Sequence, residues 1–270
     1  MTPAAGPADP TGRAARQPVV VVGRKALDGH EADAPRLGGR AWWRARRPRA
    51  VAALGAHGVD ATERVVAITY DDGPHPEHTP RILDVLARRG VRATFFTIGA
   101  FVRERPELVR RIVAEGHALG LHGADHRSLA GRDPREVVAT TLRAKAHLED
   151  VAQVPVTMFR PPYGVMPKRQ GLALWRAGLE PVMWSGDAAD WTDRPVDDVV
   201  DDARRSVFPG AMLLLHDNRA DPETLGPGER LPAFDKGAVL DRLLDLLERD
   251  HYRTRTVPEL LASYPRVVVL

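Results

Sequence analysis

The chain contains no cysteine among its 270 residues. Disulfide bonds, thiolate metal sites and cysteine-based catalysis are therefore excluded, and any bound metal must take its protein ligands from histidine, aspartate or glutamate. The absence of cysteine leaves the redox compartment of the protein open.

Long apolar runs are absent as well. The first apolar run, residues 19–22, is shorter than the roughly 7–15 residues that form the apolar region of a secretory signal peptide. No run approaches the roughly 20 apolar residues that a transmembrane helix requires. We therefore expect a cytoplasmic protein without a membrane span, or an extracellular or cell-wall protein if its true start lies elsewhere.

The charges are unevenly distributed. The net charge is +3, but residues 1–62 contain ten basic and five acidic side chains, which leaves residues 63–270 near −2. Residues 1–62 are rich in alanine, arginine, glycine and proline and show no sustained hydrophobic period, so we expect a basic, flexible N-terminal extension. The cluster at 40–49, basic with two tryptophans, suits weak association with an anionic surface. A nucleic-acid function would depend on this cluster alone, and none is expected.

From residue 63 onward, short apolar runs alternate with segments of helical period. Several of the runs are continuously apolar, which is typical of parallel strands covered on both faces. The pattern predicts an α/β fold, and polar residues after almost every strand favour a TIM-barrel-like barrel. The helix at 79–89 is expected to begin with Thr79 as its N-cap. The predicted strands are 65–70, 91–97, 117–122, 157–160, 181–184, 211–216 and 252–256, and the predicted helices are 79–89, 106–115, 133–152, 168–177, 196–207, 236–249 and 257–263.

Ionisable side chains follow five of the predicted strands. Taken singly, each group has an ordinary explanation, such as a capped turn built from aspartate, glycine and proline. The carboxyl ends of the strands of a barrel meet at one rim, so the groups together predict a catalytic site there. They are Asp71 and Asp72, His122 and His126, Arg160, Asp187 and Asp190, and His216 and Asp217.

Two histidines in this set have a spacing suited to a metal. His122 and His126, with one of the two neighbouring aspartates, offer a ligand set for one divalent ion, with Zn²⁺ favoured and Co²⁺, Mn²⁺ and Fe²⁺ as alternatives. The other aspartate is then available as a general base that Arg160 holds ionised. His216 is a candidate acid for a leaving amine. The set predicts metal-assisted hydrolysis of an amide or ester.

Five short motifs resemble those of the polysaccharide deacetylase family, the NodB-homology domain of carbohydrate esterase family four. The match covers about residues 63–265, and the motifs occur in the family's order. The resemblance implies a distorted (β/α) barrel with seven or eight strands and a deacetylase domain over residues 63–270. The motifs are Thr69-Tyr70-Asp71-Asp72-Gly73-Pro74, His122-Gly123-Ala124-Asp125-His126, Arg160-Pro161-Pro162-Tyr163-Gly164, Asp187-Ala188-Ala189-Asp190-Trp191 and Leu214-Leu215-His216.

The resemblance also implies a role for each motif. Asp71 is the general base and is oriented by Arg160, whereas Asp72 binds the metal with His122 and His126. The backbone N–H of Tyr163 stabilises the oxyanion, and Asp190 supports the acid His216. The substrate-binding residues implied are Trp191 and Leu214, which line a pocket for the acetyl methyl group, with Pro161 and Tyr163.

The expected partner is an acetylated glycan or glycoconjugate. The family mostly removes N-acetyl groups from N-acetylglucosamine units, so N-deacetylation of chitin-type or peptidoglycan-type oligo- or polysaccharides is the first interpretation. The alternatives are deacylation of a small glycoconjugate or specialised-metabolite amide, an O-acetyl xylan esterase, and a non-catalytic glycan-binding protein.

Two features depart from or extend the family pattern. Gly123 stands where the family usually has serine or threonine, whose hydroxyl helps to hold the loop that carries the ligands. Residues 218–235 form a long, proline-containing segment directly after His216. We expect this segment to form a wall of the substrate cleft.

Overall fold

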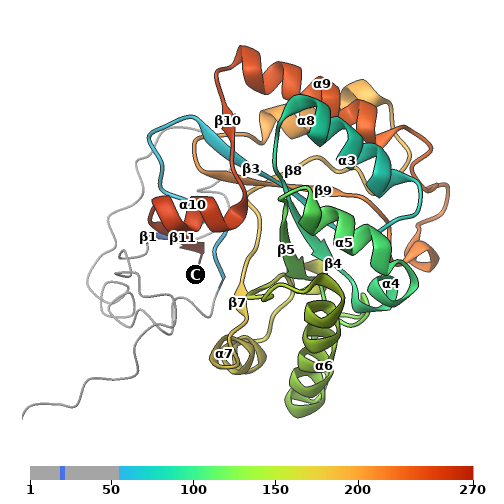
Figure 1. Cartoon of the computed structure of the whole chain (residues 1–270), viewed down its shortest axis with the longest axis vertical. Helices are drawn as coiled ribbons and strands as arrows, with labels where there is room; N and C mark the ends of the chain where they lie inside the picture. Colours follow the sequence, from blue (N-terminus) through green and yellow to red (C-terminus); the bar gives the residue numbers. More distant parts are fainter. Residues whose placement is uncertain (1–18, 22–54, 270) are drawn as a thin grey trace, which may run out of the picture.

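The computed structural model in Figure 1 describes the backbone of residues 19–21 and the whole of residues 55–269. The strands are β1 (Val19–Val21), β2 (Gly58–Val59), β3 (Val65–Asp71), β4 (Thr94–Thr97), β5 (Ala118–Leu121), β6 (Met158–Phe159), β7 (Glu180–Pro181), β8 (Gly186–Asp187), β9 (Ala211–His216), β10 (Arg253–Thr254) and β11 (Arg266–Val269). The helices are α3 (His78–Arg89), α4 (Gly99–Glu104), α5 (Pro106–Ala114), α6 (Pro134–Ala152), α7 (Lys168–Arg176), α8 (Val196–Arg205), α9 (Lys236–Arg249) and α10 (Val257–Ser263), with short 3₁₀ turns η2 (Pro162–Gly164) and η3 (Pro222–Thr224).

The strands from β3 to β9 are all parallel and form a curled sheet with helices around its outside (Figure 1). β9 lies beside β3, and the order continues through β4, β5 and β6 to β7. Near the open edge, Ala56 bridges to Val182 after β7, and Gly58 of β2 pairs with Ala211 of β9. The segment around β2 therefore joins the two edges, and the predicted α/β barrel with seven or eight strands is confirmed.

Side chains of the strands divide between two cores. Along β3, Val66, Ile68 and Tyr70 pack in the large core between the sheet and the helices, whereas Val65 and Ala67 belong to a second core that includes Val257 and Leu260 of α10. Because successive side chains of a strand point to opposite faces, Thr69 and Asp71 lie on the same face as Val65 and Ala67. The inner face of β3 thus carries an aspartate at its carboxyl end, above an apolar floor closed by α10.

Several predicted boundaries differ from the structure. The first helix begins at His78 with Glu77 at its N-cap, so the predicted cap by Thr79 is wrong. The hydroxyl of Thr79 instead donates a hydrogen bond to the buried carboxylate of Asp217. α4 and β11 were not predicted, because neither segment is long enough to show a hydrophobic period.

The folded part of the chain extends upstream of residue 63, where the sequence pattern placed the domain start. Ala56 and Val59 are both buried in the inner core. Val19–Val21 pairs in parallel with β11 at the edge of the sheet. The rest of the predicted extension, including the basic cluster at 40–49, lies outside the described residues. Among the described helices, none combines the length and apolar character needed to cross a membrane.

Candidate active site

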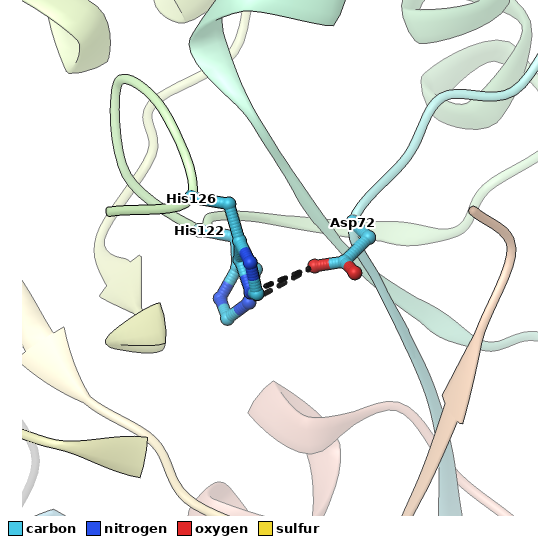
Figure 2. Close-up of side chains that lie close together, drawn as sticks. All are labelled: Asp72, His122 and His126. Atoms are coloured by element: carbon cyan, nitrogen blue, oxygen red, sulfur yellow. Dashed lines mark ion pairs between the residues drawn. The ribbon is translucent and has the colours of Figure 1, made fainter. Parts of the chain in front are cut away.

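Three side chains from two neighbouring loops converge at the carboxyl end of the barrel. The Nε2 atoms of His122 and His126 each lie 3.3 Å from Oδ1 of Asp72. Figure 2 shows both imidazole rings directed at this one carboxylate oxygen. Asp72 and His122 are almost fully buried, and within the described residues this is the one group of three such ligands close enough to hold a metal ion.

The ligand atoms fit a divalent cation. Oδ1 of Asp72 is buried without a hydrogen bond of normal geometry, although two imidazole nitrogens are aimed at it. A buried polar atom without a partner is costly, and a cation between two imidazoles and a carboxylate removes that cost. Two histidines and one carboxylate also leave coordination positions for water and substrate. The predicted ligands are therefore brought together, with Asp72 rather than Asp71 as the carboxylate.

The turn after β3 sets the direction of Asp72. Asp72 has a positive φ of 75°, a conformation that non-glycine residues adopt rarely and mostly where surrounding contacts enforce it. The next residue must be glycine, because a Cβ at Gly73 would lie 2.1 Å from Oδ2 of Asp217. The Asp-Asp-Gly run thus rotates two adjacent carboxylates in different directions.

Burial and charge act in opposite directions on these ligands. Burial opposes ionisation of Asp72, but the nearby imidazoles of His122, His126 and His216 hold the pKa of Asp72 well below its usual range. Burial lowers the pKa of His126. For His122, burial is outweighed by the carboxylates of Asp71 and Asp72, which raise its pKa. Nδ1 of His122 lies 2.8 Å from the backbone oxygen of Arg160, so it carries the proton and Nε2 faces Asp72.

Asp71 is held by Arg160 inside the barrel. Arg160 is fully buried and donates from one nitrogen to Oδ1 of Asp71 at 2.7 Å and to the hydroxyl of Thr69 at 2.8 Å. Its other nitrogens donate to the backbone oxygens of Val182 and Met183. Every branch of the guanidinium is therefore bonded, and the predicted pairing of Arg160 with Asp71 is present. Oδ2 of Asp71 remains on the side of the candidate metal ligands, 3.7 Å from Nε2 of His122.

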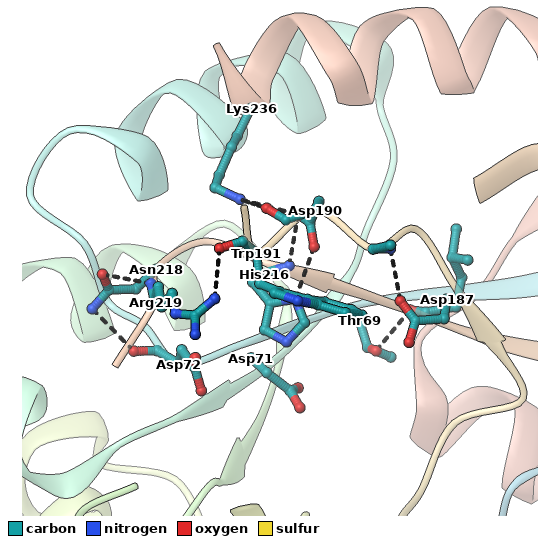
Figure 3. Close-up of polar contacts among 12 residues, drawn as sticks. Thr69, Asp71, Asp72, Asp187, Asp190, Trp191, His216, Asn218, Arg219 and Lys236 are labelled. Carbon is teal, nitrogen blue, oxygen red and sulfur yellow. Dashed lines mark hydrogen bonds and ion pairs between the residues drawn. The ribbon is translucent and has the colours of Figure 1, made fainter. Parts of the chain in front are cut away.

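His216 forms a second ion pair across the site. Its Nδ1 lies 2.8 Å from Oδ1 of Asp190, and its backbone N–H donates to Oδ2 of Asp190 at 3.0 Å. Burial would lower the pKa of His216, but the Asp190 carboxylate outweighs it and raises this pKa to about 9. In Figure 3 the free edge of the His216 ring faces Asp71 and Asp72. His216 is therefore protonated near neutral pH, with its free edge directed at Asp71 and Asp72.

The predicted substrate-binding residues surround this group. The Trp191 ring meets the His216 ring edge-on, with centroids 5.7 Å apart. Leu214 is buried on the same face of β9 as His216, two residues before it. Pro161 is buried directly before η2, and Tyr163 lies within η2 at a positive φ of 57° with 49% of its surface exposed.

Two residues that matter to the site were not predicted from the sequence. Lys236, at the start of α9, is buried and donates to the backbone oxygen and Oδ2 of Asp190 at 2.9 and 3.1 Å. Asp221, on the segment after β9, lies against His126 and Tyr163. Neither belongs to a motif. The only signal in the sequence was position: Asp221 lies within the long 218–235 segment, and Lys236 directly follows it.

The glycine in the second motif has a local structural reason. Gly123 has a φ of 102°, and a Cβ there would lie 2.7 Å from the backbone oxygen of Asp125. A serine or threonine would therefore be strained in this loop. Asp125 itself turns away from the ligands and pairs with Arg127 through both side-chain and backbone hydrogen bonds.

Comparisons with known proteins agree with this arrangement. Residues 58–182 match the family model described as polysaccharide deacetylase. A chitooligosaccharide deacetylase of Sinorhizobium fredii is 37% identical over 195 residues, which cover 72% of this chain and 90% of the relative. A peptidoglycan-N-acetylglucosamine deacetylase of Bacillus cereus is 33% identical over 205 residues, covering 75% of this chain and 91% of the relative.

Solved structures show the same architecture. The peptidoglycan deacetylase PdaC of Bacillus subtilis superposes with a TM-score of 0.63 at 28% identity, covering 75% of this chain and 92% of that one. The Bc1960 peptidoglycan N-acetylglucosamine deacetylase superposes with a TM-score of 0.69 at 29% identity, covering 79% of this chain and 95% of that one. The chain therefore belongs to the polysaccharide deacetylase family.

Proposed function

We propose that this protein removes N-acetyl groups from N-acetylglucosamine units of a chitin-type or peptidoglycan-type glycan. The observation that carries the proposal is the meeting of three groups at one barrel rim. These are the Asp72–His122–His126 triad, the Asp71–Arg160 pair and the Asp190–His216 pair. The deacetylases of this family are metal-dependent, and Zn²⁺ is the ion we propose for the triad.

Asp72, His122 and His126 would hold a divalent ion, which would polarise the acyl carbonyl and lower the pKa of a water molecule. Asp71 accepts the proton of the attacking water as general base. Arg160 supports that role because its guanidinium binds Oδ1 of Asp71 and leaves Oδ2 on the side of the proposed metal ligands. Attack forms a new C–O bond and places negative charge on the former carbonyl oxygen.

We assign the acid role to His216. Hydrolysis breaks the amide C–N bond, and the leaving nitrogen needs a proton to depart as an amine. A histidine with a pKa of about 9 is protonated near neutral pH, and Asp190 fixes its ring through Nδ1. Nε2 is then free to donate, which completes the conversion of an acetamide into acetate and an amine.

The turn at Tyr163 supports an oxyanion role for its backbone. The N–H groups of the next two residues, Gly164 and Val165, donate to backbone oxygens of Pro161 and Pro162. Within the described residues, the N–H of Tyr163 makes no such bond. A preorganised, unpaired N–H beside the metal ligands is suited to stabilise the charge that develops on the carbonyl oxygen.

The exposed aromatic rim supports a glycan as substrate. Tyr163 exposes about half of its surface while its hydroxyl is bonded to Asp221, so its ring is held in place with a face open to solvent. A rigid aromatic face stacks well on the apolar face of a sugar ring. Trp191, beside His216, is placed to line the pocket for the acetyl methyl group. Relatives named as chitooligosaccharide and peptidoglycan-N-acetylglucosamine deacetylases point to the same substrate class.

The test is acetate release by the full chain loaded with Zn²⁺. The substrates are N-acetylglucosamine oligomers, peptidoglycan fragments, acetylated xylan and free N-acetylglucosamine, each with and without a chelator. The variants are Asp72→Asn, which removes a proposed ligand, and Asp125→Asn, a matched control whose side chain pairs with Arg127 instead.

The proposal expects release from oligomers or peptidoglycan that the chelator abolishes, that Asp72→Asn loses and that Asp125→Asn keeps. Release from xylan alone would instead indicate an O-acetyl esterase. Release from the monomer alone would indicate a small-molecule deacylase, and binding of oligomers without release would indicate a glycan-binding protein. Each of these three results contradicts the proposal.

A further inference from the structure

The segment that follows β9 crosses directly over the candidate active site. The side-chain amide of Asn218 donates to the backbone oxygen of Asp72, and the backbone N–H of Ala220 donates to its Oδ2 at 3.2 Å. Arg219 donates to the backbone oxygen of Trp191 (Figure 3). These successive residues thus contact a proposed metal ligand and the proposed acetyl pocket before the chain reaches Asp221.

Asp221 continues this series with a buried carboxylate. The hydroxyl of Tyr163 donates to its Oδ2 at 2.5 Å, and Nδ1 of His126 lies 3.3 Å from the same oxygen. The rings of His126 and Tyr163 are themselves in contact, with centroids 4.5 Å apart. One carboxylate oxygen therefore faces both a proposed metal ligand and the residue of the proposed oxyanion turn.

An ordinary structural role does not account for this side chain. Asp221 occupies the N-cap position of η3, where an aspartate usually accepts a hydrogen bond from the first turn. Its side chain makes no such bond, and the turn is closed by its backbone oxygen, which accepts from Thr224. Arg219 is the nearby cation, with Nε 3.5 Å from Oδ1. The second oxygen, Oδ2, is left to Tyr163 and His126.

Both histidines of the triad have an oxygen atom near Nδ1, the ring nitrogen on the side away from Asp72. Nδ1 of His122 lies 2.8 Å from the backbone oxygen of Arg160. Nδ1 of His126 is buried without a hydrogen bond of normal geometry and lies 3.3 Å from Oδ2 of Asp221. An oxygen at Nδ1 holds the proton there, leaves the lone pair of Nε2 for a metal and fixes the ring orientation. A carboxylate does this more strongly than a carbonyl, because it also raises the basicity of the ring.

We propose that Asp221 is a positioning residue that orients His126 for metal binding and, through the Tyr163 hydroxyl, ties the oxyanion turn to that ligand. This inference rests on the proposed function, in which Asp72, His122 and His126 hold the metal. It gives the 218–221 segment a task in metal binding, in addition to any role as a wall of the cleft.

The primary test is the Zn²⁺ affinity of the full chain, measured by competition with a chromophoric chelator. Asp221→Asn keeps the shape of the side chain but removes its charge, and we expect the Zn²⁺ dissociation constant to rise about 10–100-fold. Glu223→Gln is the matched control, since it removes an exposed carboxylate from the same turn. Tyr163→Phe keeps the Asp221 charge, so Zn²⁺ affinity should be retained. His126→Ala is the reference for loss of a ligand.

A second readout separates positioning from a general loss of charge. In the Zn²⁺-loaded protein, the Nδ1 protons of His122 and His126 are observable by NMR of ¹⁵N-labelled histidine. Asp221→Asn should move the His126 resonance upfield and speed its exchange with water, because the carboxylate acceptor is lost. The His122 resonance should not move, because its acceptor is the backbone oxygen of Arg160.

The outcomes are distinguishable from failure of the proposed function. If wild-type protein binds Zn²⁺ and His126→Ala loses it, the triad stands. Unchanged affinity and an unmoved His126 resonance in Asp221→Asn would then overturn the role of Asp221. An equal loss of Zn²⁺ affinity in Glu223→Gln would also overturn the role of Asp221, since any negative charge on the turn would then account for the effect. If His126→Ala binds Zn²⁺ as tightly as wild type, the metal site itself is wrong.

Discussion

Replacing Asp190 by asparagine should lower the pKa of His216 from about 9 to near its ordinary value. Asp190 accepts from the ring and the backbone of His216, at 2.8 and 3.0 Å, and is almost fully buried. The difference between the ordinary 6.5 and about 9 corresponds to about 3 kcal/mol. Asparagine removes this charge, so the lowering effect of burial is opposed only by the charges of Asp72 and Asp71. It also leaves the buried Lys236 without its counter-ion.

The consequence for catalysis follows from the fraction of His216 that is protonated. At pH 7.5, a pKa of about 9 leaves nearly all of the imidazole protonated, whereas a pKa of 6.5 leaves about a tenth. If His216 is the acid, kcat/KM of Asp190→Asn at pH 7.5 should fall at least about tenfold from ionisation alone. Loss of ring orientation adds to this, because the asparagine side chain has one acceptor oxygen in place of two.

The direct assay is an NMR titration of the His216 ring proton in metal-free wild-type and Asp190→Asn protein. A pH profile of kcat/KM for the metal-loaded forms, whose basic limb should move to lower pH, completes it. Asp241→Asn removes a surface ion pair with Arg89 and is the control. It should change neither the pKa of His216 nor the pH profile of kcat/KM. A His216 pKa that stays near 9 in Asp190→Asn would refute the assignment of this shift to Asp190.

The same pair predicts a pH dependence of stability. The pKa of His216 is raised in the folded state, so the stabilisation from its pairing is fully present below about 6.5 and is lost as pH rises through about 9. The difference in unfolding free energy between wild type and Asp190→Asn should therefore shrink across that interval. Urea denaturation of the metal-free proteins at several pH values measures it.

Three further predictions concern the neighbouring carboxylates. Arg160→Met breaks the buried pair with Asp71 and should cost about 3–5 kcal/mol in urea denaturation; a near-neutral result would contradict a stabilising role of this pair. Burial, with the nearby charge of Asp72, raises the pKa of Asp217 to about 7. Asp217 therefore lowers the free energy of unfolding progressively as the pH rises from about 4 to 7. Asp217→Asn should then stabilise the metal-free protein by up to about 4 kcal/mol at pH 8 and not at pH 4; equal effects at both would exclude this ionisation. Zn²⁺ at 100 times its dissociation constant should stabilise wild type by about 2.7 kcal/mol and should not stabilise Asp72→Asn; an equal thermal shift in both proteins would place the metal elsewhere.

The residues at the strand ends could be found from the sequence because their placement is local. A run such as Val65–Asp71 is apolar throughout and ends in an acid, and parallel strands bring their carboxyl ends to one edge. His122, Arg160 and His216 follow the same rule. The α/β barrel, all of its helices except α4 and the set of converging ionisable groups were therefore predictable from period and order alone.

The turns and partners at the site were not predictable in this way. Thr79 looked like a helix cap but bonds Asp217, 138 residues away in the chain. Ala56 bridges the open edge of the sheet, although the composition around it resembles that of the basic extension. Such contacts depend on where the sheet places a whole loop in space. A short stretch of sequence does not contain that information.

The sequence by itself determined which groups are available for chemistry and at which strand ends they lie, because strand period and motif order are properties of adjacent residues. Spacing alone left open which of the two aspartates joins the histidines, and the family resemblance implied Asp72. The tertiary structure shows how, since a turn at positive φ directs one oxygen of Asp72 at both imidazoles. It alone also placed Lys236 on Asp190 and Asp221 on His126. These pairings join residues that are far apart along the chain, and they exist because closure of the barrel brings its rim loops together.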